Sequence, residues 1–120
     1  TRSDGPRRAR GIVRRMTDFH GQVVWITGAT AGLGRAMARE FARRGADVAV
    51  SGRREDRLAE VVAEIEGLGR RGLAVPCDVR REEDVAAAVA RVVEVFGRLD
   101  VAVANAGFGV VGRVESLSLE

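Results

Sequence analysis

Short apolar runs alternate with longer amphipathic segments along this chain, and this alternation restricts the folds that are open to it. The short runs have the length of buried strands and occupy residues 22–27, 47–51, 72–77 and 99–105. The segments between them repeat their apolar side chains at helical spacing and occupy residues 33–44, 55–68 and 82–96. Strand and helix therefore alternate. We predict an α/β fold with a doubly wound, incomplete parallel sheet of about four strands and three helices, joined by right-handed crossovers.

Individual residues refine this prediction. The first helix is expected to turn one apolar face inward, formed by Leu33, Ala36, Met37, Ala38 and Phe41. Pro76 has no backbone donor, so the third strand is expected to lie at a sheet edge or to end there. The fourth strand is expected to present an open edge, which a further strand normally covers.

The first 18 residues have a different character from the rest. All 20 basic residues are arginines, and six of these fall in residues 1–16 beside a single acid, Asp4. We predict a disordered basic leader over 1–18 and the N-terminal part of a folded domain over 19–120. A transit peptide would show a clearer amphipathic pattern, and a nucleic-acid arm would carry aromatic or base-reading partners. No nucleic-acid partner is therefore expected.

Composition excludes several other classes of protein. One cysteine, Cys77, cannot form an internal disulfide and fits a reducing, cytoplasmic setting. The only histidine, His20, does not make a metal site with it. No apolar run is long enough to span a bilayer, so no membrane association is expected.

A glycine-rich turn follows the first expected strand. Gly28, Gly32 and Gly34 stand between this strand and the first helix. Glycines there allow a tight turn and a close approach of the backbone to a pyrophosphate, which the amino end of the helix attracts. A P-loop requires a lysine after its last glycine, but Gly34 is followed by Arg35. The turn therefore predicts a dinucleotide site.

Three motifs together resemble the short-chain dehydrogenase/reductase family, in its classical rather than its extended branch. Residues 27–34 read T-G-x-x-x-G-x-G, residues 77–79 read Cys-Asp-Val, and residues 104–107 read Ala-Asn-Ala-Gly. The last motif resembles the family's N-N-A-G, with Ala104 in place of its first asparagine. The resemblance covers roughly residues 20–120 and implies the front, cofactor-binding part of a Rossmann-like domain. It also implies that Asp78 meets the adenine amino group.

The second strand bears on the choice of nicotinamide cofactor. Gly52 stands where NAD-using members of the family usually carry an aspartate, and Arg53 follows it. Arginine binds a phosphate bidentately, and Ser51 can add a hydrogen bond. We therefore expect NADP rather than NAD, although Arg53 and Arg54 can also be read as solvated residues before a helix. The expected cofactor-binding residues are Gly28, Thr30, Ala31, Gly32, Leu33, Gly34, Ser51, Arg53, Arg54, Asp78, Val79, Asn105, Ala106 and Gly107.

The resemblance also implies where the chemistry lies. The family's catalytic serine and Tyr-x-x-x-Lys pair follow the fourth strand, and the 120 residues contain no tyrosine and no lysine. We therefore expect no catalytic residue here, an inactive chain by itself, and a domain truncated before its catalytic segment. The intact protein would be an NADP-dependent oxidoreductase acting on a carbonyl or alcohol substrate, assembled as a homodimer or homotetramer. The alternative is a non-catalytic NADP(H)-binding module.

Overall fold

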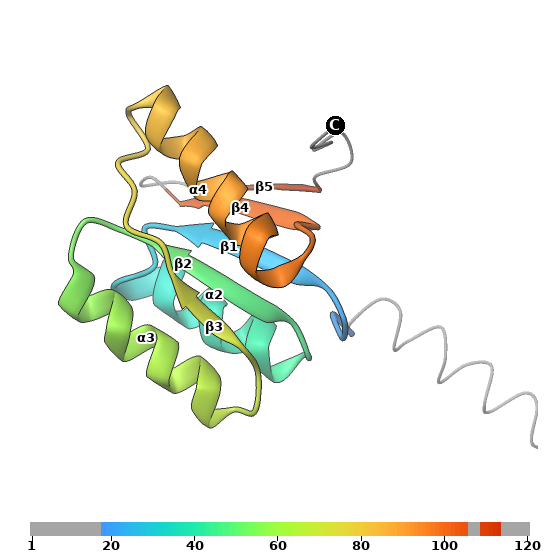
Figure 1. Ribbon diagram of the computed structural model, residues 1–120. Coiled ribbons are helices and arrows are strands. Elements are labelled where there is room, and N and C mark those ends of the chain that lie inside the picture. Colours follow the sequence, from blue (N-terminus) through green and yellow to red (C-terminus); the bar gives the residue numbers. More distant parts are fainter. Residues whose placement is uncertain (1–17, 106–108, 114–120) are drawn as a thin grey trace, which may run out of the picture.

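The computed structural model describes residues 18–105 and the backbone of residues 109–113. Strands and helices alternate as predicted over residues 23–105 (Figure 1). The elements are β1 (Val23–Thr27), α2 (Gly32–Arg43), β2 (Asp47–Ser51), α3 (Glu55–Gly67), β3 (Gly72–Ala74), α4 (Glu82–Phe96), β4 (Val101–Asn105) and β5 (Gly109–Arg113). The predicted leader over 1–18 lies outside the described residues except for its last position.

The sheet has the strand order β3-β2-β1-β4-β5. Its first four strands are parallel, with Val24 of β1 opposite Val48 of β2 on one side and opposite Val101 of β4 on the other. The predicted four-stranded parallel arrangement with three helices is therefore confirmed. The order of the strands reverses between β1 and β4, and at such a switch point the carboxyl ends of parallel strands leave a crevice.

The outer edge of β4 is not open, so that prediction is wrong. β5 pairs antiparallel with β4, from Asn105 opposite Gly109 to Val101 opposite Arg113. Unpaired backbone donors and acceptors along a strand edge are unfavourable, and the chain that follows β4 supplies partners for them. The run at 109–113 contains two glycines, which weaken a strand pattern and hid this element in the sequence.

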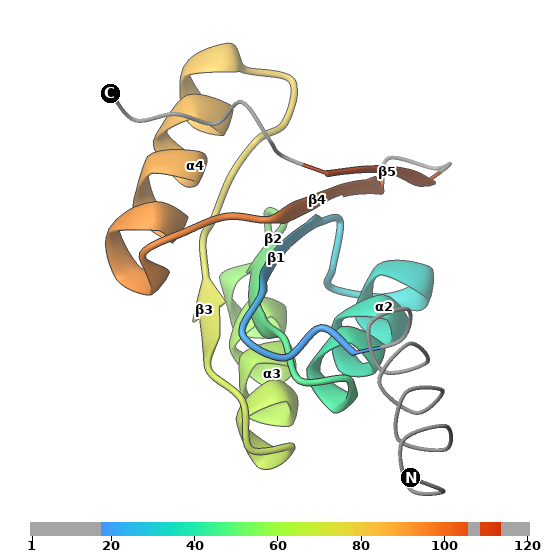
Figure 2. The same cartoon turned by 90° about the vertical axis from the view of Figure 1, so that its right-hand side faces the viewer.

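Helices cover both faces of the sheet. Figures 1 and 2 show α2 and α3 on one face and α4 on the opposite face. Side chains along β1 alternate between them: Val24 and Ile26 pack with the α2–α3 core, whereas Val23 and Trp25 pack with the α4 core. This period of two is the pattern of a strand buried on both faces.

The third strand behaves as its proline predicts. β3 ends before Pro76 and forms one edge of the sheet.

The buried face of α2 differs from the predicted one. It consists of Gly34, Ala38 and Ala42, whereas Leu33 is 62% exposed. Ala36 is exposed as well, so the expectation that Leu33 and Ala36 face the core is wrong. One residue corresponds to about 100° of helical rotation, which places Leu33 away from the line that starts at Gly34.

Candidate functional site

The turn between β1 and α2 has a backbone geometry that favours glycine. Gly28 and Gly32 have φ angles of +63° and +61°. A Cβ atom on Gly28 would overlap the carbonyl oxygen of Asn105, and one on Gly34 would overlap the carbonyl oxygen of Gly28. Ala31, at the N-cap of α2, has no side chain that can accept from the first helical N–H groups. These donors therefore remain available to an anion at the turn.

Hydrogen bonds between the ends of β1 and β4 hold this turn in place. The N–H of Asn105 donates to Thr27 Oγ1 at 3.1 Å, and the Thr27 hydroxyl donates to the Val103 carbonyl at 3.3 Å. The side-chain amide of Asn105 also donates to the carbonyl of Gly28 at 3.2 Å. Side chains of Thr27 and Asn105 thus link the ends of the two strands that flank the switch point.

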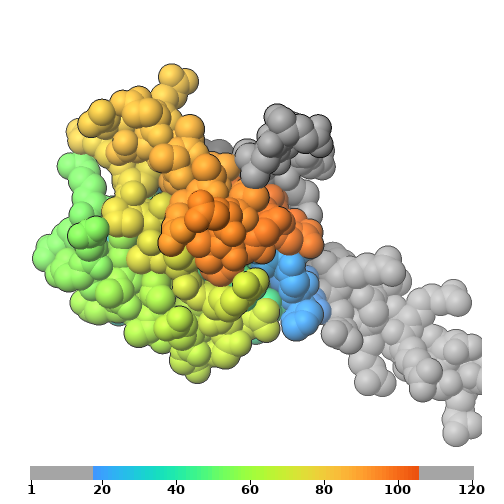
Figure 3. Space-filling model, viewed as in Figure 1, coloured from blue at the N-terminus to red at the C-terminus, as the bar shows by residue number. Residues whose placement is uncertain are grey.

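A cavity of about 440 Å³ opens at this carboxyl edge of the sheet. Its volume falls in the ordinary range of small-molecule sites. In the space-filling view, a hollow separates the green surface after β2 from the yellow surface after β3 (Figure 3). The cavity is lined by Thr27, Gly28, Thr30, Gly52, Arg53, Arg54, Cys77, Asp78, Val79, Arg80 and Asn105.

The β2 side of the cavity is positively charged and lacks a carboxylate on the strand end. Arg53 is exposed and makes no ion pair with any other residue that the structure describes, whereas Arg54 lies 3.6 Å from Asp56. A Cβ atom added to Gly52 would lie 2.8 Å from Cγ2 of Thr30. Position 52 therefore has little room for a larger side chain while Thr30 keeps its conformation. An unpaired guanidinium next to a glycine, which adds no negative charge, favours an anionic ligand at this position.

The β3 side of the cavity carries an ion pair. Arg80 donates from its backbone N–H and Nε to Oδ1 of Asp78, at 3.1 and 3.0 Å, and from Nη2 to Oδ2 at 2.9 Å. These hydrogen bonds, with a smaller contribution from the charge of Arg53, hold the pKa of Asp78 well below its ordinary value. Asp78 is therefore a carboxylate at neutral pH. Val79, 45% exposed beside it, adds an apolar surface to the wall.

Only some of the predicted cofactor-binding residues line this cavity. The predicted residues that do so are Gly28, Thr30, Arg53, Arg54, Asp78, Val79 and Asn105. Ala31, Gly32, Leu33 and Gly34 belong to the adjoining turn and the start of α2. Ala106 and Gly107 lie outside the described residues. The role of these residues in cofactor binding stays a prediction.

Ser51 lies in a different environment from the one expected for a phosphate ligand. Its side chain is fully buried, and its Oγ accepts a hydrogen bond of 2.7 Å from Nε1 of Trp25. The hydroxyl therefore binds a side chain of the core on the α4 face of the sheet in this structure. Its backbone carbonyl accepts from the N–H of Ala29 at 3.1 Å, so the residue fixes the glycine turn through its main chain.

The structure adds cavity residues that the sequence did not single out as ligands. Thr27 and Gly52 enter through their backbone position at strand ends, which the strand assignment could have suggested. Arg80 enters through its ion pair with Asp78. The only signal for it in the sequence is that it directly follows the Cys-Asp-Val motif. Cys77 is buried; burial, together with the carboxylates of Asp84 and Asp78, raises the pKa of its thiol. The thiol therefore stays protonated, and it forms part of the cavity wall.

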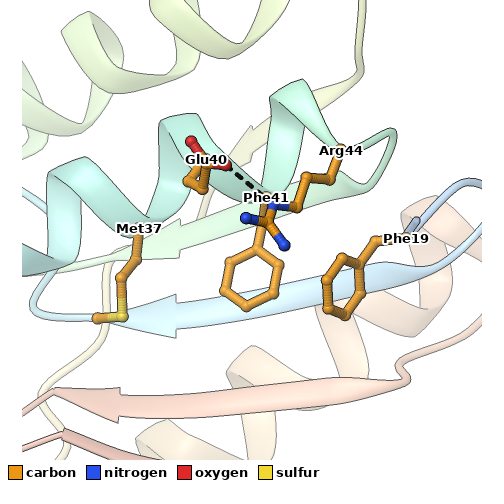
Figure 4. Close-up of a pocket in the computed structure, with 5 residues that line it drawn as sticks. All are labelled: Phe19, Met37, Glu40, Phe41 and Arg44. Carbon is orange, nitrogen blue, oxygen red and sulfur yellow. Dashed lines mark hydrogen bonds and ion pairs between the residues drawn. The ribbon is translucent and has the colours of Figure 1, made fainter. Parts of the chain in front are cut away.

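A second cavity, of about 280 Å³, lies along α2 (Figure 4). Its lining is mainly apolar, with Met37 and Phe41 from α2 and Phe19 from the segment before β1. The rings of Phe19 and Phe41 meet edge to face, with centroids 4.9 Å apart. Glu40 and Arg44 pair with each other at 2.9 Å. This cavity lacks the glycine turn and the unpaired arginine of the first, so it is the poorer candidate for a phosphate-bearing ligand.

No group of three or more histidine, cysteine or acidic side chains in the described part of the chain could hold a metal ion. No helix of residues 18–105 is long and apolar enough to cross a membrane.

The sheet order, the glycine turn at the switch point and the cavity beside it define a Rossmann-like α/β protein. A family model described as short chain dehydrogenase matches residues 22–120. The chain belongs to this family and corresponds to its N-terminal portion.

Similar proteins support the same assignment. The chain is 45% identical over 103 residues to a 3beta-hydroxysteroid dehydrogenase of Mediterraneibacter gnavus, covering 85% of this chain and 37% of that protein. It is 48% identical over 90 residues to an L-rhamnose 1-dehydrogenase (NAD(P)(+)) of a Sphingomonas species, covering 74% and 35%. The crystal structure of a hydroxysteroid dehydrogenase from Escherichia coli superposes with a TM-score of 0.73 at 37% identity, over 76% of this chain and 39% of that one. The chain thus spans about a third of the length of the relatives it matches.

Proposed function

We propose that the protein to which these residues belong is an NADP-dependent oxidoreductase that transfers hydride between the nicotinamide and a carbonyl or alcohol substrate. Related proteins carry the names of dehydrogenases for steroids and sugars, which are substrates of this chemical class. The cofactor, when bound, supplies the hydride chemistry. The residues described here bind and orient it, and the groups that assist proton transfer are not among the 120.

The preference for NADP rests on one observation, the unpaired guanidinium of Arg53 next to Gly52. A ribose that carries a free 2′-hydroxyl is usually held by a carboxylate at the end of the second strand, whereas a 2′-phosphate needs a cation. Gly52 has no side chain, and Cγ2 of Thr30 lies only 2.8 Å from the position of a Cβ atom at 52. Charge and space therefore both favour the phosphorylated cofactor.

The other parts of the cavity fit the rest of a dinucleotide. The backbone cradle at Gly28 and Gly34, which a Cβ atom would fill, suits a pyrophosphate at the start of α2. Asp78 and Val79 offer a carboxylate and an apolar surface to an adenine. Asn105 stands at the end of β4, on the side of the switch point where we place the nicotinamide half. Ala106 and Gly107 are part of this proposal through their motif.

The assignment is tested by the affinity of the full-length chain for NADPH and NADH, measured by nicotinamide fluorescence. We expect Arg53→Asp to weaken NADPH by about 10- to 100-fold, the range of one charge-assisted pair, and to change NADH far less. Arg57→Asp makes the same charge change in α3 outside the cavity and should leave the ratio unaltered. An equal loss for both cofactors in Arg53→Asp would sink the NADP assignment.

The proposed reaction and the proposed assembly are each tested directly. Turnover is measured as oxidation of NADPH with a panel of ketones and aldehydes, or as reduction of NADP with secondary alcohols. This assay distinguishes an enzyme from a binding module, which would bind the cofactor without turnover. We further propose a homodimer or homotetramer in the cytoplasm, checked by light scattering of the full-length chain and by cell fractionation.

A further inference from the structure

The carboxylate of Asp78 has a defined number of acceptor positions left. A carboxylate accepts about four hydrogen bonds, two on each oxygen. Oδ1 already accepts two from Arg80, and Oδ2 accepts one, from Nη2 of the same residue. Among the described residues no other group donates to this side chain. One acceptor position therefore remains, and it is on Oδ2.

The backbone that carries this carboxylate is itself held. The N–H of Asp78 donates to Oδ2 of Asp84 in the first turn of α4 at 3.3 Å, and its carbonyl accepts from the N–H of Arg81 at 3.0 Å. One residue earlier, the N–H of Cys77 donates to the carbonyl of Gly52 at 3.5 Å. Main chain and side chain of Asp78 are thus both fixed, by different partners.

Arg80 also keeps Asp78 away from a competing partner. Arg53 lies on the opposite wall of the same cavity and is close enough for its charge to act on Asp78. Apart from Arg80, Arg53 is the only described cation whose charge lowers the pKa of Asp78, and pairing between them would neutralise the guanidinium that faces the ligand. Because the guanidinium of Arg80 binds both carboxylate oxygens of Asp78, Arg53 stays unpaired.

We propose that Arg80 is a positioning residue of the purine pocket, which presents the last acceptor of Asp78 to an exocyclic amino group. The inference rests on the proposed dinucleotide function. A purine with an amino group at this position donates to Oδ2 of Asp78, whereas a purine with an oxo group places an acceptor against a carboxylate. Arg80 therefore sets the preference for adenine over hypoxanthine through Asp78, without contacting the base.

The test uses the full-length chain, NADPH and the analogue of NADPH that carries hypoxanthine in place of adenine, with nicotinamide fluorescence as the measure of binding. We expect the wild type to prefer NADPH by about 10-fold or more, since one base edge changes from donor to acceptor. In Arg80→Ala this preference should fall to about 3-fold or less, mainly through weaker NADPH binding. In Asp78→Asn, adding Arg80→Ala should alter the ratio no further, because the two residues act through one contact.

Two variants separate positioning from simple charge. Arg80→Lys keeps the charge but lacks the planar fork, so it should not restore the wild-type ratio. Arg81→Ala removes a neighbouring exposed arginine that pairs with Glu83 outside the cavity, and should leave the ratio unchanged.

The outcomes separate this inference from the proposed function. If the wild type binds the cofactor and Arg80→Ala weakens NADPH and its analogue equally or not at all, or Lys restores the ratio fully, the inference is overturned and the function stands. If the wild type binds neither NADPH nor NADH, both fall. Circular dichroism of each variant confirms that it is folded.

Discussion

The side-chain amide of Asn105 at the end of β4 donates to the carbonyl oxygen of Gly28, the first residue after β1, at 3.2 Å. The backbone N–H of the same asparagine donates to Thr27 Oγ1 at 3.1 Å. One residue therefore joins the last residue of β1 and the first of the glycine turn across the switch point. The turn's geometry depends on β4 as much as on its own glycines.

Removing this amide should loosen the turn. We expect Asn105→Ala to lower the free energy of unfolding by about 1 kcal/mol, the usual net contribution of one hydrogen bond. Asn105→Asp should be at least as damaging, because a carboxylate oxygen would then face the Gly28 carbonyl. Urea denaturation of the full-length chain measures both changes. A stability equal to that of the wild type in both variants would show that the bond is dispensable.

Gly34 and Gly67 form a matched pair of helical glycines with opposite expected responses. A Cβ atom on Gly34 would overlap the Gly28 carbonyl oxygen and approach Nδ2 of Asn105 to 2.7 Å, whereas Gly67 has nothing within 4 Å. We expect Gly34→Ala to destabilise the fold by about 2 kcal/mol through overpacking. Gly67→Ala should stabilise it by about 0.5 kcal/mol, because alanine loses less backbone entropy in a helix. Thermal unfolding compares the two; a gain at Gly34 would contradict the packing described for the turn.

Changing the cofactor preference should require two substitutions. An aspartate at 52 supplies the carboxylate that NAD needs, but its Cβ atom would lie 2.8 Å from Cγ2 of Thr30. Thr30→Ser removes that methyl group and keeps the hydroxyl. We therefore expect Gly52→Asp alone to gain little NADH affinity, and Gly52→Asp with Thr30→Ser to gain about 10-fold more. Strictly additive effects in a titration of all four combinations would rule out this coupling.

Asp47, at the start of β2, should make stability depend on acid pH. Burial alone would raise the pKa of this carboxyl, but hydrogen bonds from the backbone and guanidinium of Arg71 outweigh it and hold the pKa below its ordinary value. A carboxyl whose folded-state pKa is lowered stabilises the fold above its unfolded-state pKa, and this contribution is lost as the pH falls through the folded-state value. Asp47→Asn should therefore lower stability by about 1–2 kcal/mol at pH 7, and the difference from the wild type should shrink below about pH 4.

The control for this prediction is Asp56→Asn. Asp56 is exposed, and its ion pair with Arg54 is 3.6 Å long, so solvent screening leaves it little effect on stability. Denaturation curves at several pH values should show a pH-dependent gap for Asp47→Asn only. A constant gap down to pH 3 would mean that packing, not charge, explains the role of Asp47.

The fold and the glycine turn could be predicted because they follow from local patterns. Strands buried on both faces leave continuous apolar runs, and the positive φ angles at Gly28 and Gly32 demand glycine whatever lies around them. Features set by partners distant in sequence were missed. The burial of Ser51 depends on Trp25 from the neighbouring strand, and β5 forms because β4 needs a partner along its edge. Arg80 lies near Asp78 in sequence, but its place in the cavity follows from the course of the chain between β3 and α4.

The indole of Trp25, which donates a hydrogen bond to Ser51, gives this part of the protein an intrinsic fluorescence reporter. Trp25 is the only tryptophan in the 120 residues, which also contain no tyrosine, and its indole is buried two residues before the end of β1, where the glycine turn begins. Its emission overlaps the absorption of reduced nicotinamide, so a bound NADPH should quench it by energy transfer. The same indole would report the packing of β1 against β2 whenever the ligand changes it.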